Sequence, residues 1–181
     1  WKTVGVFESK YRTRHPELAA RTFFGAGYIY VNIAKETNDT KAWADVAKHY
    51  EKYLKNYSKV KALHEQVQAH VFIGDSYRSL KKPDNAKAET AYRKALAIFD
   101  ANGIEKVAEN KDKAAMLNAA AKARYYVAEK DFQAFASIKF PDYKPEKEVP
   151  KTIEKWWNDK IGEEKAKKEK ELIKYLRLLA R

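Results

Sequence analysis

Aromatic side chains recur along this chain at a nearly constant interval. Phe7, Tyr50, Tyr92 and Phe132 are 43, 42 and 40 residues apart. Three of them stand in similar phrases, which are YEKYL at 50–54, YRKAL at 92–96 and DFQAFA at 131–136. A phrase that recurs at a fixed period is typical of a repeat protein, in which each unit buries its apolar face only by stacking on the next unit. The chain is therefore predicted to fold as an array of similar units.

The repeated phrases have the spacing of α-helices. Their apolar positions follow one another at offsets of four, three and one residues, which places them on one helix face. Gly (6 residues) and Pro (5 residues) are scarce, and Ala, Lys and Glu are abundant, so the composition favours an all-α fold. The matching positions are Val46, Tyr50, Tyr53 and Leu54, then Ala88, Tyr92, Ala95 and Leu96, then Ala128, Phe132, Phe135 and Ala136.

Two glycines occupy equivalent positions in predicted helices. Gly27 and Gly74 are each followed three residues later by a tyrosine, Tyr30 and Tyr77. A glycine inside a helix costs about 1 kcal/mol relative to alanine. Its recurrence at one phase of the repeat predicts that a neighbouring helix approaches closely there.

Turn signals divide the chain into predicted helices. Pro16 fits the first turn of one helix, Asp39 or Thr40 caps the next, and Ser58 is expected to cap a third. Residues 112–140 contain no turn signal, which leaves open whether the third unit is a hairpin or one helix of about 28 residues. We expect an array over 1–140, with hairpins at 16–56 and 59–103 and a helix at 112–140, a Pro-containing linker at 141–150, and a C-terminal helix at 151–181.

The two ends of the chain suggest a longer protein. Segment 1–14 carries Phe7 and is predicted to be the closing helix of an upstream unit, and the apolar stripe near the other end runs to Arg181 without a stop signal. Gly162 is expected to split the C-terminal helix.

Several functional classes find no support in the sequence. The chain has no cysteine, and its four histidines lack the HExxH spacing of a zinc site. No serine elbow, phosphate-binding glycine loop or run of ~20 apolar residues occurs. We therefore predict a protein that is not an enzyme, needs no cofactor or metal, and contains no transmembrane segment.

The net charge of +12 leaves two interpretations open. Only eight of the 37 basic residues are arginine, which is the side chain best suited to phosphate contacts. A lysine-rich solvated surface is the simpler interpretation. The alternative is a basic helical module that binds nucleic acid or anionic lipid.

The paired helix phrases resemble the tetratricopeptide repeat. The resemblance is carried by AHVFIGDSY at 69–77 followed by AETAYRKAL at 88–96, and it covers residues 16–103 well and 104–140 in part. The chain departs from that family at His70, where an aromatic residue is usual, and at Ser58 and Asp100, where a closing proline is usual. The resemblance implies a tetratricopeptide-like α-solenoid of antiparallel helix hairpins.

The same resemblance implies a protein-binding scaffold. The apolar stripe that runs to Arg181 leaves another interpretation open, a helical assembly subunit of a larger complex. Tetratricopeptide arrays bind partner segments on the concave surface formed by the first helix of each pair. Phe24 and Tyr28 occupy positions where the carboxylate-clamp subfamily has Lys and Asn, so capture of a C-terminal carboxylate is not expected. The predicted partner-binding residues are Arg21, Phe24, Tyr28, Asn32, Gln68, Val71, Asp75, Arg78 and Ser79.

A narrower resemblance concerns the compartment. The tyrosine- and lysine-rich segment AAAKARYYVAEKDFQAFASIKFP at 119–141 is similar in style to large repeat proteins of the Gram-negative envelope, including gliding-motility components of deltaproteobacteria. That resemblance favours the periplasm or the cell envelope over the cytoplasm.

Overall fold

The chain is helical throughout the part that the structure describes. A computed structural model describes residues 2–139, 155 and 157–179, and these contain helices and no strand. The predicted all-α fold is therefore confirmed for these residues. The chain divides into two compact units, residues 1–123 and 124–181. The linker predicted at 141–150 lies outside the described residues.

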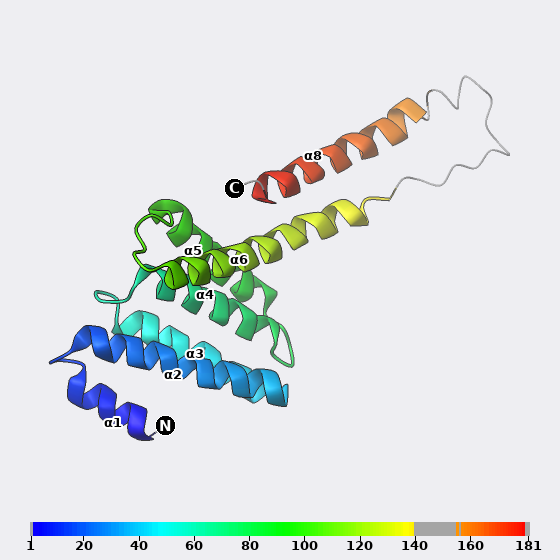
Figure 1. Cartoon of the computed structure of the whole chain (residues 1–181). Helices are drawn as coiled ribbons and strands as arrows, with labels where there is room; N and C mark the ends of the chain where they lie inside the picture. Colours follow the sequence, from blue (N-terminus) through cyan, green and yellow to red (C-terminus); the bar gives the residue numbers. More distant parts are fainter. Residues whose placement is uncertain (1, 140–154, 156, 180–181) are drawn as a thin grey trace. The chain divides into compact units, whose positions relative to one another are not determined.

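Unit 1 consists of helices that follow one another in space as they do in sequence. From α1 to α4, each helix packs against the next one, and α2 also contacts α4 (Figure 1). This pattern follows from the short connections, because helices joined by a few residues fold back on each other. The helices are α1 (Lys2–Tyr11), α2 (Pro16–Thr37), α3 (Thr40–Asn56), α4 (Leu63–Arg78), α5 (Asn85–Asn102) and the first part of α6 (Asn110–Ser137).

Local signals explain most of the helix ends. Pro16 begins α2, and Asn38 ends it in the left-handed conformation at φ 49°. The Asp39 carboxylate accepts a hydrogen bond from the Lys41 backbone N–H at 2.9 Å, and the Asp84 carboxylate accepts one from the Lys87 N–H at 3.0 Å. Each cap satisfies a backbone N–H that would have no partner inside the helix.

The start of α4 differs from its prediction. Ser58 does not cap this helix, which begins at Leu63. The backbone N–H groups of Val60 and Lys61 both bond to the Tyr57 carbonyl, so the chain makes a separate turn first. Tyr57, the first residue after α3, is buried, and its ring lies 5.7 Å from that of Phe23 on α2.

The two repeated glycines make the close contacts that their spacing predicts. A Cβ atom added to Gly27 would lie 2.5 Å from Cζ of Tyr50, and one added to Gly74 would lie 2.5 Å from Cε1 of Tyr92. The tyrosine ring of the second helix thus occupies the space that a side chain of the first helix would need. The same interlock joins α2 to α3 and α4 to α5.

The core of unit 1 contains the central aromatic residues of the repeat. Tyr50 and Tyr92 are almost completely buried, together with Tyr53, Phe23 and Phe24. Phe7 is half-buried and Phe132 is 41% exposed. Two of the four recurring aromatic residues therefore belong to this core.

The sequence left open whether the third unit is a hairpin or one long helix, and the structure shows one helix, α6. Asn110–Ser137 is one uninterrupted helix of 28 residues, and the boundary between the two units falls within it. Unit 2 holds its second part, a π-helical turn at Trp157–Ile161 and α8 (Gly162–Leu179). Phe132 and Tyr175 are in ring contact at 5.5 Å, and Lys168 lies 4.9 Å from the centre of the Phe135 ring.

Candidate partner-binding surface

The nine predicted binding residues divide between surface and interior. Those on the surface are Arg21, Tyr28, Asn32 and Arg78, and Ser79, just after α4, is partly exposed. Four others, Phe24, Gln68, Val71 and Asp75, are buried. For the three α4 residues the reason is that α4 lies between α2 and the beginning of α6, so the face that was expected to be open is covered. Phe24, on α2, packs against Tyr50 and Tyr53 of α3. In this structure these four residues have a packing role, and the other five remain at least partly accessible to solvent.

Tyr28 is the most prominent aromatic residue of the exposed set. Its ring is 39% exposed and packs edge-on against Phe24 at 5.6 Å and Phe72 at 5.5 Å. Its hydroxyl donates a hydrogen bond to Oε1 of Gln68. Partial burial raises the pKa of Tyr28, so the hydroxyl stays protonated and remains a donor. The ring therefore presents one face to solvent in a fixed orientation.

Asp75 is held inside unit 1 by two partners. Its Oδ1 accepts a hydrogen bond from the Tyr92 hydroxyl at 2.8 Å, and its Oδ2 pairs with Lys122 of α6 at 2.5 Å. Burial and the nearby Asp75 charge raise the pKa of Tyr92. Arg78, although exposed, also hydrogen-bonds to Tyr92. This network joins α4, α5 and α6.

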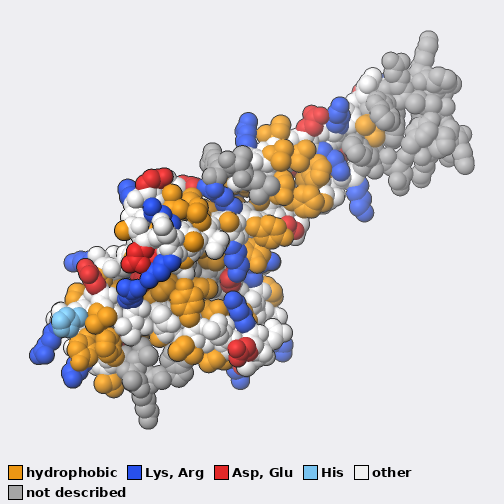
Figure 2. All heavy atoms as spheres, viewed as in Figure 1, with side chains coloured by type: hydrophobic (Ala, Val, Ile, Leu, Met, Phe, Trp, Pro, Cys, Tyr) orange, Lys and Arg blue, Asp and Glu red, His pale blue; other side chains and the backbone are white. Residues whose placement is uncertain are grey.

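Charges of both signs lie at the start of α6, where Glu109 is within the electrostatic reach of Arg21. Lys111 pairs with Glu109 at 3.0 Å, and His64 lies 3.7 Å from Asp112. The pKa of Glu109 is lowered, mainly by Lys111 and to a smaller extent by Arg21. Figure 2 shows the same mixture on the visible face of unit 1, where hydrophobic side chains alternate with lysine and arginine.

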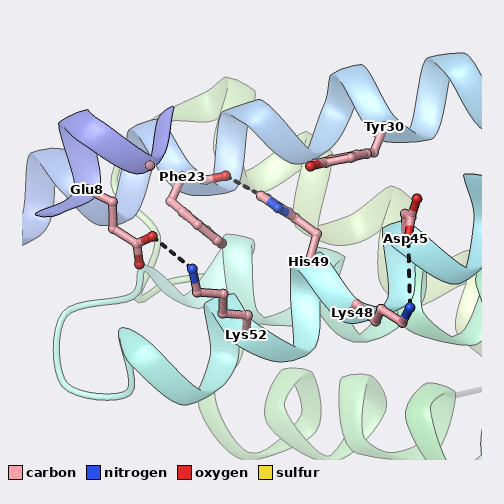
Figure 3. Close-up of a pocket in the computed structure, with 8 residues that line it drawn as sticks. Glu8, Phe23, Tyr30, Asp45, Lys48, His49 and Lys52 are labelled. Carbon is pink, nitrogen blue, oxygen red and sulfur yellow. Dashed lines mark hydrogen bonds and ion pairs between the residues drawn. The ribbon is translucent and has the colours of Figure 1, made fainter. Parts of the chain in front are cut away.

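A cleft of about 380 Å³ lies between α1, α2 and α3 (Figure 3). Lys52 pairs with Glu8 at 3.0 Å, and Nδ2 of Asn56 donates a hydrogen bond to the same carboxylate at 3.3 Å. The His49 ring stacks on Phe23 at 4.3 Å. Because a carbonyl only accepts, Nε2 of His49 carries the proton of its 2.8 Å hydrogen bond to the Phe23 carbonyl. Burial lowers the pKa of His49 and favours the neutral ring.

A second cleft, of about 370 Å³, lies at the equivalent place one repeat later, between α3, α4 and α5. Here the Tyr77 hydroxyl donates to Oε1 of Glu51 at 2.7 Å. Burial and the nearby charges of Lys94 and Lys61 lower the pKa of His70 to about 4. This cleft carries more positive charge than the first one. It is lined by Glu51, Leu54, His70, Ile73, Tyr77, Lys87, Thr90, Ala91 and Lys94.

In comparisons with known proteins, no protein-family model matches this chain, and neither a curated protein nor a solved structure gives a significant match. The structural features of the chain itself therefore carry the functional argument.

Two further findings concern the described residues alone. In residues 2–139 and 157–179, no three potential ligands from His, Cys, Asp and Glu come together as a metal site. Over the same part of the chain, no helix combines the length and the apolar character that crossing a bilayer requires.

The two clefts were not among the predicted sites, although the sequence contains a signal for them. Their linings repeat at the offsets of the helix phrases, because Glu8 corresponds to Glu51 at 43 residues and Lys52 to Lys94 at 42. Aligning the polar positions of the repeat, as well as its apolar ones, would have found both.

Proposed function

We propose that the chain is a non-enzymatic scaffold that binds a segment of a partner protein along the exposed face of α2 that carries Arg21, Tyr28 and Asn32. The observation that carries this proposal is the fixed and partly exposed ring of Tyr28. Aromatic and arginine side chains contribute most to protein interfaces. A ring that is already oriented loses little conformational entropy when a partner covers it.

The charges around Tyr28 suggest how the partner is oriented. Arg21 lies one helical turn before Gly25 and two turns before Tyr28, and the pKa of Glu109, lowered mainly by its partner Lys111, is lowered further by the charge of Arg21. The charge of Asp112, which lies 3.7 Å from His64, contributes to the raised pKa of Tyr28. Such mixed pairs favour a partner with both acidic and basic groups over one with a single sign of charge. This binding surface is narrower than the one predicted from the sequence, because it excludes the buried face of α4.

Selection from a random peptide library, followed by NMR mapping, tests the proposal. We expect selected peptides to perturb the amide resonances of α2. Tyr28→Ala should weaken their binding by about 2 kcal/mol or more, as for a central interface residue. Tyr28→Phe should retain most of the affinity, because it keeps the ring and loses only the bond to Gln68.

The control is Tyr125→Ala, which removes another exposed tyrosine, on the part of α6 that belongs to unit 2. It should leave peptide binding unchanged. If the selected peptides bind Tyr28→Ala as tightly as the original chain, or perturb only residues outside α2, the proposed site is excluded.

A further inference from the structure

Helix α2 carries an apolar stripe that the described residues of unit 1 leave about half exposed. We name Leu18, Gly25, Ile29 and Ile33 the outer stripe of α2. Leu18 is 53% exposed, Ile29 55% and Ile33 41%. Their spacing of seven, four and four residues places all four on one helix face. This face is distinct from that of Gly27, which packs on Tyr50.

Gly25 has no structural role inside unit 1. A Cβ atom added there would meet nothing within 4 Å, whereas the same addition at Gly27 would meet Tyr50. Among the described glycines only Gly103 has a positive φ, so backbone conformation does not require glycine at residue 25 either. A mid-helix glycine destabilises a helix relative to alanine. What glycine provides at such a place is room for another backbone to approach closely.

The next repeat shows what this helix face does when it is covered. Leu18, Gly25 and Ile29 correspond to residues 47 positions later on α4. These are Glu65, Phe72 and Ser76. Glu65 accepts a hydrogen bond from Tyr53 of α3, and Phe72 stacks on Tyr50 at 4.9 Å. Glu65 and Ser76 are buried. At this phase of the repeat, the helix face is therefore one that packs against other helices.

The outer stripes of two α2 helices are complementary when the helices run in opposite directions. The midpoint between Leu18 and Ile33, and that between Glu17 and Lys35, both fall at residues 25–26. Two antiparallel copies of α2 that cross at Gly25 would place Leu18 against Ile33 and Glu17 near Lys35. A two-fold arrangement uses each of these contacts twice.

We propose that the chain forms a two-fold symmetric dimer through the outer stripe of α2, with the two helices antiparallel and crossing at Gly25. The occupant of the stripe is a second copy of this chain. The dimer requires no other protein, although its surface adjoins the proposed partner-binding surface, because Ile29 follows Tyr28 and Ile33 follows Asn32 on the same helix. Burial of three exposed apolar side chains from each copy drives the association.

Sedimentation equilibrium of the whole chain tests the dimer. We expect a monomer–dimer equilibrium for the original chain, and dimerisation weakened about 100-fold or more in Ile29→Lys, because a buried lysine has no partner there. Leu117→Lys is the matched control, because Leu117 is exposed to a similar degree on α6. It should dimerise like the original chain. Sedimentation as a monomer at all concentrations, or equal weakening by both variants, overturns the proposal.

Disulfide trapping tests the crossing point and the helix direction. The chain has no cysteine, so Gly25→Cys introduces its only thiol. Mild oxidation should link Gly25→Cys into a covalent dimer faster than Gly162→Cys, which places a thiol at another glycine with open space around it. Equal rates for the two variants overturn the crossing point.

A mixture of Leu18→Cys and Ile33→Cys chains distinguishes antiparallel from parallel packing. Antiparallel helices should form the mixed disulfide in preference to either self-linked product. The opposite preference would mean that the helices are parallel, and would overturn the proposed arrangement even if the chain dimerises.

Discussion

Glycine and tyrosine form the contact that repeats most faithfully in unit 1. The ring of Tyr50 occupies the place of a side chain at Gly27, and the ring of Tyr92 does the same at Gly74. Both contacts are close enough that an added methyl group would displace the ring. Each glycine lowers the helix propensity of its own segment, but it lets the neighbouring helix approach more closely.

Gly27→Ala and Gly25→Ala should change stability in opposite directions. At Gly27 the methyl group would overlap Tyr50, and overpacking of this kind costs about 1–3 kcal/mol. At Gly25 the methyl group enters open space, and the gain in helix propensity is about 0.5–1 kcal/mol. Urea unfolding of the two variants under conditions where the chain is monomeric measures both effects. Equal shifts for the two variants would contradict the Gly27–Tyr50 contact.

The hydroxyl groups of the two tyrosines differ although their rings are equivalent. Tyr50 has a buried hydroxyl with no hydrogen-bond partner among the described residues, whereas the Tyr92 hydroxyl donates to Asp75. Tyr50→Phe should therefore leave the free energy of unfolding unchanged or raise it by about 1 kcal/mol. Tyr92→Phe should lower it by about 1–2 kcal/mol, because Asp75 loses a partner. Chemical denaturation compares them, and a larger loss for Tyr50→Phe would contradict the hydrogen-bond assignment.

Because the pKa of His70 is lowered in the folded chain, we expect the chain to lose stability in mild acid. Its folded-state pKa is lowered to about 4, mainly by burial and also by Lys94 and Lys61, while in the unfolded chain its pKa is near 6.5. The unfolded chain therefore binds the proton first, and the stabilisation is complete above pH 6.5 and is lost as the pH falls towards 4. The loss is on the order of 3 kcal/mol over that range. Unfolding measured from pH 7 to 5 should show a shallower pH dependence in His70→Gln, and an unchanged slope would contradict a buried neutral ring.

At the scale of helices, the capping of α4 is weaker than that of α3 or α5. Asp39 and Asp84 cap α3 and α5 through their carboxylates, whereas Ala62, at the start of α4, has no side chain that can accept a hydrogen bond. Its backbone is extended, with φ −67° and ψ 151°, which is the conformation that a capping residue requires. The position is therefore suited to a polar cap that the sequence does not supply.

Ala62→Asp should stabilise the chain by about 1 kcal/mol, because its carboxylate can accept from a free backbone N–H in the first turn and its charge is favourable at a helix N-terminus. Ala62→Asn separates the two effects, since it keeps the cap without the charge. Thermal unfolding measures both variants. No gain in either would mean that the start of α4 differs from the described geometry.

Local signals explain why so much of this helical fold was predictable. The starts of α2 and α3, the interlocks at Gly27 and Gly74, and the burial of Tyr50 and Tyr92 all follow from residues close together in sequence or at one repeat phase. The burial of Asp75 did not follow, because its partner Lys122 is 47 residues away and has no motif that marks it. The start of α4 was missed because it depends on burial of the Tyr57 ring, which is a tertiary effect.

At the scale of the whole molecule, net charge and binding surface suggest different partners. The chain carries a net charge of +12, and its described lysines include several in ion pairs with neighbouring carboxylates. A charge of this kind attracts nucleic acid or anionic lipid without selecting between them. Partner binding at the proposed surface around Tyr28 should depend much less on salt, because its main contact is an aromatic ring.

A salt titration separates these two functions. We expect duplex DNA and anionic vesicles to bind the chain only at low salt and to be released between about 50 and 200 mM, as for non-specific phosphate contacts. Peptides selected for the Tyr28 surface should lose much less affinity over the same range. Retention of DNA or vesicles at the higher salt concentration would favour the basic module over the protein-binding scaffold.

The interlock at each helix pair has a consequence for how this chain tolerates insertions. Gly27 and Tyr50 are separated by 23 positions and Gly74 and Tyr92 by 18, yet both pairs make the same contact. The extra residues of the first pair lie in its helices, because its turn at 38–39 is shorter than the turn at 79–84 of the second pair, so the contact is kept at two different turn lengths. The turns at residues 38–39 and 79–84 are therefore the places where an epitope tag or a fluorescent label could be added, since a longer turn adds little to the entropic cost of closing the hairpin.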